Sequence, residues 1–164
     1  VTGLVHTPSI HPYQEFRRRL EALAQCDEGA DFPVEVDEHY GLTEYLRAVV
    51  FHERERCPLC YDLRLERTVQ AAVAGGYDAF TSTLLYSRYQ NHSLLVENCT
   101  ALANRHILIF HDEDFRLGWQ QGIDESIRLG LYRQPYCGCI YSEQERDDRQ
   151  LRKQRKQERS GAAS

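Results

Sequence analysis

Residues 57–86 read CPLCYDLRLERTVQAAVAGGYDAFTSTLLY and carry the clearest structural signals in the chain. A proline fits the first turn of a helix, and the apolar residues that follow recur at helical spacing, so the pattern predicts a helix that starts at Pro58. The Gly75-Gly76 pair is typical of a helix end. Residues 80–86, which are rich in threonine and leucine, are predicted to form a strand. The stretch therefore predicts a helix followed at once by a strand.

The same alternation of strands and helices extends in both directions along the chain. Strands are predicted at residues 1–5, 32–36 and 107–110, and helices at residues 42–55, 91–104 and 119–129, with a further helix from residue 12 that ends at residues 27–29. This alternation favours an α/β fold, in which helices cover a parallel sheet and ligands bind in loops beyond the carboxyl ends of its strands. Four polar residues are expected in or near such loops: His6, His11, Ser87 and Asp112.

The composition is that of an ordinary soluble globular chain. Its 164 residues suffice for one domain with its own core, and the formal net charge of −5 argues against a surface that is basic all over. Local basic patches stay compatible with that charge. No apolar run approaches the roughly 18 residues of a membrane span, and no export signal is visible. We therefore expect a cytoplasmic protein with no membrane partner.

The C-terminal part of the chain differs in composition from the rest. Residues 1–142 are expected to form the folded domain, whereas residues 143–164 are almost wholly polar and predict a solvated helix that frays into a disordered tail. Basic side chains there could contact a phosphate backbone, although acidic and amide residues are interspersed and a charge run is usually a solvated face. These basic residues are Arg149, Arg152, Lys153, Arg155 and Lys156.

Two closely spaced cysteines stand at the start of the helix predicted from Pro58. With Pro58 as the first helical residue, Cys57 would be the N-cap and Cys60 would lie in the first turn, where free amide hydrogens and the helix dipole favour the thiolate form. A thiolate is the form required for metal ligation or nucleophilic attack. The spacing is shared by zinc sites, iron-sulfur proteins and thioredoxin-like dithiols, and two structural thiols are a further alternative.

A second pair, Cys137 and Cys139, is separated by a single glycine. A disulfide between them would close a very small, strained ring that is easier to reduce, and Gly138 supplies the backbone freedom that such a ring requires. The pair is therefore a candidate for a labile, functional disulfide. A competing interpretation joins the four paired sulfurs in one tetrahedral zinc site, and spacing alone leaves both open. The isolated Cys26 and Cys99 are interpreted as small hydrophobic residues.

Two further polar positions are candidates for the site. His11 lies between a predicted strand end and a predicted helix start, where a substrate anion would be held, although a surface or capping role is the simpler interpretation. The acidic run at residues 112–114 follows a predicted strand and could supply an acid, a metal ligand or a ribose-binding group, or could equally cap a helix. Asp114 is its member with a candidate role as an acid.

Four segments together resemble the QueH type of epoxyqueuosine reductase, and the match extends in order over residues 1–142. The segments read IHPYQEFRRRL (residues 10–20), RCPLCYDLRL (56–65), FTSTLL (80–85) and YRQPYCGCIYS (132–142), and Asp114-Phe115-Arg116 belongs to the same match. The resemblance implies that the epoxide of epoxyqueuosine at the tRNA wobble position is reduced to the cyclopentene, the last step of queuosine biosynthesis. It also implies a Rossmann-like fold of the nucleotide-hydrolase kind.

The resemblance implies roles for both cysteine pairs. Cys57 and Cys60 match cysteines that help hold a [4Fe-4S] cluster, and an additional iron is a further candidate cofactor. Cys137 and Cys139 match a pair assigned as a redox-active disulfide. The implied partners are a tRNA that carries epoxyqueuosine in its anticodon loop and an electron donor whose identity the sequence leaves open. We hypothesise that the cluster delivers electrons near the epoxide oxygen, that the dithiol stores or relays them, and that Asp114 supplies a proton.

One feature of the family does not occur in this sequence. The family carries an adjacent Cys-Cys motif after its first strand, which supplies other cluster ligands, and that segment would precede Val1. We therefore expect the first strand of the sheet to be missing, as in a truncated gene model or a fragment; a genuine variant of the family is the alternative. Two rival interpretations are kept: a structural or nucleic-acid-binding module whose four paired cysteines hold zinc without redox chemistry, and an inactive fragment.

Overall fold

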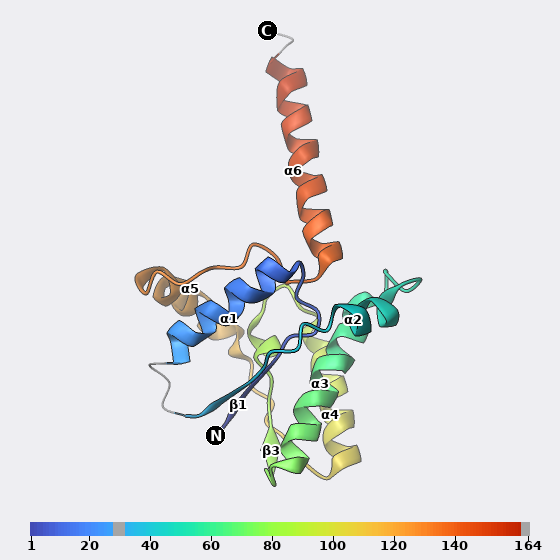
Figure 1. Ribbon diagram of the computed structural model, residues 1–164, viewed down its shortest axis with the longest axis vertical. Helices are drawn as coiled ribbons and strands as arrows, with labels where there is room; N and C mark the ends of the chain where they lie inside the picture. Colours follow the sequence, from blue (N-terminus) through green and yellow to red (C-terminus); the bar gives the residue numbers. More distant parts are fainter. Residues whose placement is uncertain (28–31, 162–164) are drawn as a thin grey trace.

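The computed structural model describes residues 1–27 and 32–161, with side chains of the last helix described as far as Lys153. Figure 1 shows a helical body with short strands, from which the last helix projects. The predicted helix end at residues 28–29 and the predicted disorder at residues 162–164 lie outside the described residues.

The N-terminal part of the chain forms one pair of parallel strands. β1 (Gly3–His6) pairs with β2 (Val34–Asp37), and α1 (Tyr13–Asp27) lies between them in the sequence. The register places His6 opposite Asp37, and the two side chains share a hydrogen bond of 2.8 Å. The strands predicted near residues 1–5 and 32–36 are thus confirmed, each displaced slightly toward the C-terminus.

A second pair of parallel strands follows further along the chain. β3 (Ala79–Phe80) pairs with β4 (Ile109–Phe110), and α4 (His92–His106) connects them. The prediction of a strand over residues 80–86 is wrong for most of its length. There the Ser82 hydroxyl accepts a hydrogen bond from the Leu84 amide and caps a short 3-10 helix, η1 (Thr83–Tyr86).

The sheet organisation is simpler than the sequence predicted. Among the described residues, the strands form two separate two-stranded sheets, β1–β2 and β3–β4. Each pair is connected through a helix, as parallel strands require. The protein is therefore a mixed α/β structure with short parallel strands, and a continuous Rossmann-like sheet is not confirmed.

Two helices differ from the prediction at their ends. α2 (Leu42–Val49) stops well before residue 55, because Val50 is extended and Phe51 takes a left-handed conformation with φ of 70°. α3 (Arg56–Ala74) starts before Pro58 but ends as predicted, at Gly75. The other helical elements are η2 (Phe115–Gly118), α5 (Trp119–Arg128) and α6 (Ile140–Gly161). The predicted helices at residues 91–104 and 119–129 are confirmed by α4 and α5.

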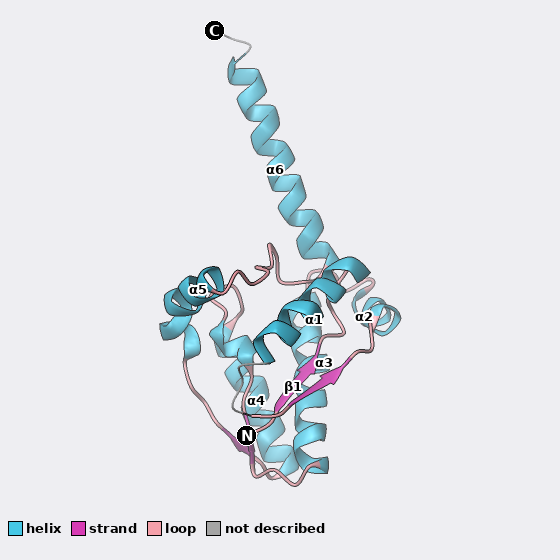
Figure 2. Cartoon of the chain, turned by 60° about the vertical axis from the view of Figure 1, so that its left-hand side comes forward, coloured by secondary structure: helices cyan, strands magenta, loops and turns pink. Residues whose placement is uncertain are grey.

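Two clusters of buried side chains form the core. The larger cluster joins α3, α4, β3 and η1, and α3 and α4 lie side by side in both views (Figures 1 and 2). The smaller cluster consists of Tyr45, Val49 and Cys139, with Cys60 packed against it. It lies where α2, α3 and the start of α6 meet, so packing alone brings one member of each cysteine pair to the same place.

The C-terminal helix α6 extends away from both cores (Figure 2). Arg56 at the start of α3 anchors its base, since the guanidinium forms an ion pair with Glu145 at 2.5 Å and lies 5.8 Å from the ring centre of Tyr141. No helix in the described part of the chain combines the length and apolar character needed to cross a membrane.

Candidate active site

The first cysteine pair lies in the first turn of α3. Because α3 starts at Arg56, Cys57 is already inside the helix and is not its N-cap, which corrects the expected geometry. Cys57 is exposed, whereas Cys60 is half-buried and its thiol donates a hydrogen bond of 3.2 Å to the Ser9 hydroxyl. Desolvation raises the pKa of both thiols above their ordinary value and so opposes the predicted thiolate form.

The second cysteine pair divides between the interior and the surface. Cys139 is buried, and its sulfur lies 2.8 Å from the hydroxyl of the fully buried Tyr45. Burial raises the pKa of Tyr45, and the contact with Cys139 adds to that shift. The phenol therefore keeps its proton at neutral pH and can donate it to the sulfur in a hydrogen bond. Cys137 is exposed, so one sulfur of this pair meets solvent while the other is held inside.

The loop that carries the second pair is held at its backbone. Two nitrogens of the Arg19 guanidinium donate to the carbonyl oxygens of Cys137 (3.0 Å) and Tyr136 (2.9 Å). The His11 amide donates to the Gly138 carbonyl at 2.7 Å, and the Tyr136 hydroxyl donates to the His11 carbonyl at 2.5 Å. Gly138 has φ of 119°, which glycine adopts without strain. The loop is therefore fixed from α1 and from the turn that precedes it.

A buried carboxylate sets the direction of the Arg19 side chain. Glu15, one turn earlier on α1, is only 4% exposed and accepts a hydrogen bond of 2.8 Å from Arg19 Nε. Its second oxygen accepts from the Tyr132 hydroxyl at 2.5 Å. Both oxygens of the carboxylate are satisfied. Arg19 Nη2 also lies 2.8 Å from the Glu15 carboxylate, and both terminal guanidinium nitrogens donate to the cysteine loop. The arginine run at residues 17–19 thus contributes at least one structural clamp.

The two cysteine pairs are close enough to influence one another. Negative charge on Cys137, Cys60 or Cys139 raises the pKa of Cys57. All six cysteines in the chain are free thiols. Within the described ranges, however, no three His, Cys, Asp or Glu side chains are grouped so as to hold a metal ion. The residues present do not by themselves fit either a complete iron-sulfur cluster or the four-cysteine zinc site.

His11 is close to this site, and its imidazole is enclosed by the protein. Its side chain has no exposed surface, and its ring packs against Tyr40 (5.4 Å between centres) and Tyr45 (5.1 Å). Burial lowers its pKa from 6.5 to about 4, so the ring is neutral at physiological pH. A neutral, enclosed imidazole argues against the predicted contact with substrate. The structure places His11 beneath the cysteine loop instead.

Asp114 lies at the start of η2, where it caps the helix. It accepts a hydrogen bond from the Arg116 amide. It also forms a bidentate ion pair with the Arg116 guanidinium, in which both nitrogen–oxygen distances are 2.7 Å. These bonds lower the pKa of Asp114 to about 2. The carboxyl group is ionised at neutral pH and has no proton to donate. The capping alternative therefore describes its geometry, and the role as an acid finds no support there.

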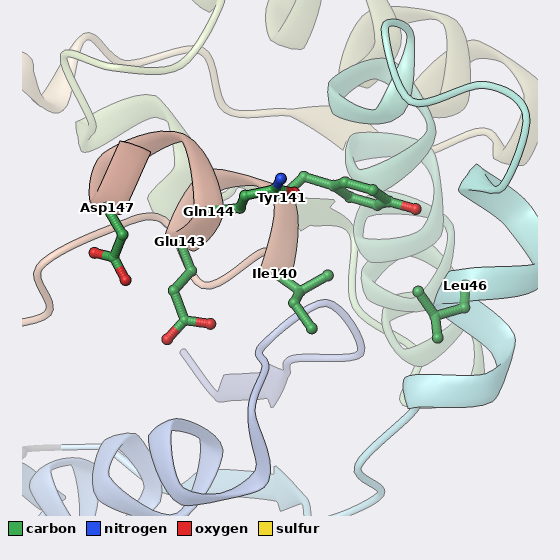
Figure 3. Close-up of a pocket in the computed structure, with 6 residues that line it drawn as sticks. All are labelled: Leu46, Ile140, Tyr141, Glu143, Gln144 and Asp147. Atoms are coloured by element: carbon green, nitrogen blue, oxygen red, sulfur yellow. The ribbon is translucent and has the colours of Figure 1, made fainter. Parts of the chain in front are cut away.

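A surface hollow opens beside the smaller core cluster (Figure 3). It has a volume of about 400 Å³ and is lined by Leu46 of α2 and by residues in the first turns of α6. Two of its lining residues, Leu46 and Tyr141, pack against the smaller core cluster, so the hollow borders that cluster. Figure 3 shows the carboxylates of Glu143 and Asp147 on the same side of α6.

Comparison with known proteins assigns the family. A family model described as Epoxyqueuosine reductase QueH matches residues 1–145. The chain belongs to the QueH family. An epoxyqueuosine reductase QueH from Dehalococcoides mccartyi is 36% identical over 141 residues, which cover 86% of this chain and 78% of that protein. Another from Thermotoga maritima is 32% identical over 162 residues, covering 92% and 83%.

The QueH match includes both cysteine pairs and ends inside α6. The resemblance recognised in the sequence is therefore confirmed at the level of the family. Sequence reasoning did not find three side chains that position the QueH cysteines: Tyr45, Glu15 and Arg19. Their contacts with the loop join residues about a hundred positions apart, for example Arg19 with Tyr136, and local spacing carries no signal for such contacts. The tyrosine-rich segment YRQPYCGCIYS was the one indication in the sequence that side chains around the cysteines help to position them.

Proposed function

We propose that this chain reduces epoxyqueuosine to queuosine in tRNA. The match to the QueH family over residues 1–145 carries the proposal, and the two adjoining cysteine pairs support it. Conversion of an epoxide to an alkene takes up two electrons and two protons and releases the oxygen as water. Oxidation of two thiols to one disulfide supplies the same electrons and protons. Oxidation of the Cys137 and Cys139 dithiol to a disulfide therefore supplies the two electrons and two protons of one turnover.

The two thiols are suited to different parts in that reaction. The exposed Cys137 can meet a substrate, while the buried Cys139 is held ready by Tyr45 to close a disulfide with it. The positive φ of Gly138 allows the tight ring. Because a disulfide of this size is strained, an external electron donor can readily reduce it and restore the dithiol. The donor's identity is open.

An iron-sulfur cofactor is a separate part of the proposal. Cys57 and Cys60 would supply two thiolates to a [4Fe-4S] cluster, with or without an additional iron, and the described residues offer no grouped third ligand. No reaction step is therefore assigned to that cluster. Anaerobic reconstitution followed by iron, sulfide and zinc analysis distinguishes the alternatives. Iron with acid-labile sulfide supports the cluster, and one tightly bound zinc supports the structural module.

The proposed substrate also implies a partner molecule and a cellular location. The proposed partner is a tRNA with epoxyqueuosine in its anticodon loop, whose unpaired bases can be turned out into a protein site. Acting on tRNA would place the protein in the cytoplasm. The apolar and acidic hollow beside Ile140, which borders the smaller core cluster, is a candidate place for part of the anticodon loop.

The deciding experiment measures the modified nucleosides themselves. The reduced protein is incubated with tRNA that carries epoxyqueuosine, and digested nucleosides are quantified by mass spectrometry. We expect epoxyqueuosine to be replaced by queuosine, and both Cys137→Ser and Cys139→Ser to abolish turnover. Cys26→Ser is the matched control, since Cys26 is an exposed thiol at the end of α1. Full activity in Cys137→Ser would rule out the dithiol, and an inactive parent protein would rule out the function.

A further inference from the structure

A group of aromatic side chains stands at the surface outside the cysteine site. Trp119 at the start of α5 lies 5.1 Å from the ring centre of Tyr86 and 5.8 Å from that of Tyr89. The Arg88 guanidinium carbon lies 5.9 Å from the same indole centre. Tyr89 is 85% exposed. We call these four residues, Tyr86, Arg88, Tyr89 and Trp119, the Trp119 platform.

The Trp119 platform has a rigid foundation. The residues before Tyr86, Leu84 and Leu85, are buried in the larger core cluster. The Tyr86 hydroxyl donates a hydrogen bond of 3.1 Å to the Trp119 carbonyl. One turn later on α5, any side chain larger than that of Gly122 would collide with the Tyr86 hydroxyl. The rings are therefore held in place before any ligand arrives, while the outermost ring stays open to solvent.

The platform is tethered to the cysteine site through Tyr61. Tyr61 follows Cys60 in α3, and its hydroxyl donates to the side-chain oxygen of Gln90 at 2.7 Å and accepts from the Asn91 amide at 3.1 Å. Gln90 is the neighbour of Tyr89. Cys57, Cys60 and Cys137 all lie near enough to Tyr61 to raise its pKa, although burial is the larger cause. One side chain thus links the platform's loop to both cysteine pairs.

The chemistry of the platform fits unpaired nucleobases. Exposed aromatic rings stack with bases of any sequence, and an arginine beside them adds cation–π attraction and can meet a phosphate. Packing within the protein does not account for Tyr89, because most of its ring faces solvent. A single-stranded loop, whose bases can leave their own stack, presents both of the groups that the platform can bind.

We propose that the Trp119 platform binds single-stranded RNA by stacking bases on Tyr89 and Trp119, with Arg88 facing the backbone. The inference rests on the proposed function where it identifies that RNA as the anticodon loop. The bases held there would flank the reacting nucleotide, since Tyr61, which follows Cys60 in α3, bonds to Gln90 next to Tyr89. The platform would thereby position the loop, while the dithiol acts on the modified base.

The chain provides its own reporter for the test, because Trp119 is its one tryptophan. The full chain is titrated with an anticodon stem-loop RNA while tryptophan fluorescence is recorded. We expect saturable quenching by the stem-loop and little quenching by a fully paired RNA of similar length. Tyr89→Ala should weaken binding on the order of tenfold, and Tyr89→Phe, which keeps the ring, should bind as the parent does. Phe51→Ala removes another exposed ring, remote in sequence, and should leave binding unchanged.

The outcomes separate this inference from the proposed function. Quenching that Tyr89→Ala weakens, in a protein that reduces no epoxyqueuosine, would uphold the platform and overturn the function. Reduction with unchanged fluorescence, and with Tyr89→Ala binding RNA like the parent, would overturn the platform and leave the function standing. Equal quenching by paired RNA would also overturn it. Equal melting temperatures of the parent and Tyr89→Ala would show that the loss concerns binding and not folding.

Discussion

His11 is fully buried between two tyrosine rings, and neither of its ring nitrogens has a hydrogen-bond partner among the residues that the structure describes. An unpaired polar atom in the interior costs free energy, and a charged ring there would cost more. Both backbone polar groups of His11 are hydrogen-bonded. Its amide donates to the Gly138 carbonyl, and its carbonyl accepts from the Tyr136 hydroxyl. His11 therefore contributes through its backbone to the cysteine loop and carries a side chain that burial keeps neutral.

This burial predicts a specific dependence of stability on pH. The pKa of His11 is about 4 in the folded protein and 6.5 as its ordinary value, so below pH 6.5 the unfolded chain takes up a proton that the folded protein does not. The free energy of unfolding should fall as the pH decreases from 6.5 to 4 and then lose this dependence. At ~1.4 kcal/mol per pKa unit, the contribution is about 3.5 kcal/mol.

Urea denaturation of the parent and of His11→Phe, measured at about pH 5 and about pH 7.5, checks the prediction. Phenylalanine keeps an aromatic ring between Tyr40 and Tyr45 but cannot be protonated. The variant should lose less stability on acidification than the parent. Other titrating groups, such as His6, are common to both proteins and cancel in the comparison. An identical loss in the two proteins would show that His11 is not the group responsible.

At the scale of elements, α1 holds the cysteine loop through one side chain. Arg19→Ala removes two hydrogen bonds to the loop carbonyls and leaves the buried Glu15 carboxylate without its cation. We expect the free energy of unfolding to fall by about 2–3 kcal/mol, because an uncompensated buried charge is costly. Amide hydrogen exchange of residues 136–139 should also become faster, since the loop loses its attachment.

The control for Arg19→Ala is Arg17→Ala on the exposed face of the same helix. This change removes the same charge and side chain without contact to the loop and should alter stability by less than about 0.5 kcal/mol. Denaturation and hydrogen exchange measured in parallel test both variants. Equal effects of the two changes would mean that Arg19 acts through general charge and not as a clamp.

The elements that the sequence predicted well are those whose signals are local. α4 follows an asparagine whose side chain caps it, and α3 ends at a glycine pair, so residue type and spacing were sufficient there. Residues 80–86 satisfied the composition of a strand, yet the strand ends at Phe80 and the Ser82 hydroxyl caps a 3-10 helix over residues 83–86. The two cysteine pairs were recognised by spacing. Tyr45 and Arg19 could not be, because only tertiary folding brings them to the cysteines.

For the whole molecule, the distribution of charge along α6 is the main asymmetry. The chain carries a net charge of −5, but residues 149–159 contain six basic residues and one acidic residue. The base of the helix is fixed by the pairing of Arg56 with Glu145, whereas the side chains at residues 149–153 are exposed. The part of α6 that carries positive charge is therefore the part that projects from the body (Figure 1).

Removal of residues 149–164 should separate folding from binding of tRNA. Because the lost side chains at residues 149–153 are all exposed, the free energy of unfolding should change by less than about 0.5 kcal/mol. Contacts between basic residues and phosphates release counterions, so their loss should make the dependence of log K on log salt shallower, by up to ~0.9 per contact. Binding of intact tRNA at several salt concentrations measures this slope.

A matched variant with Arg152→Gln and Lys153→Gln keeps the helix length and removes two charges, so its slope should lie between those of the parent and the shortened chain. Quenching of Trp119 by the stem-loop alone should change much less, because stacking at the platform does not use the tail. An unchanged slope after the deletion would leave α6 beyond residue 148 as a solvated helix without RNA contacts. A lower slope with intact quenching would assign phosphate binding to the tail and base stacking to the body of the protein.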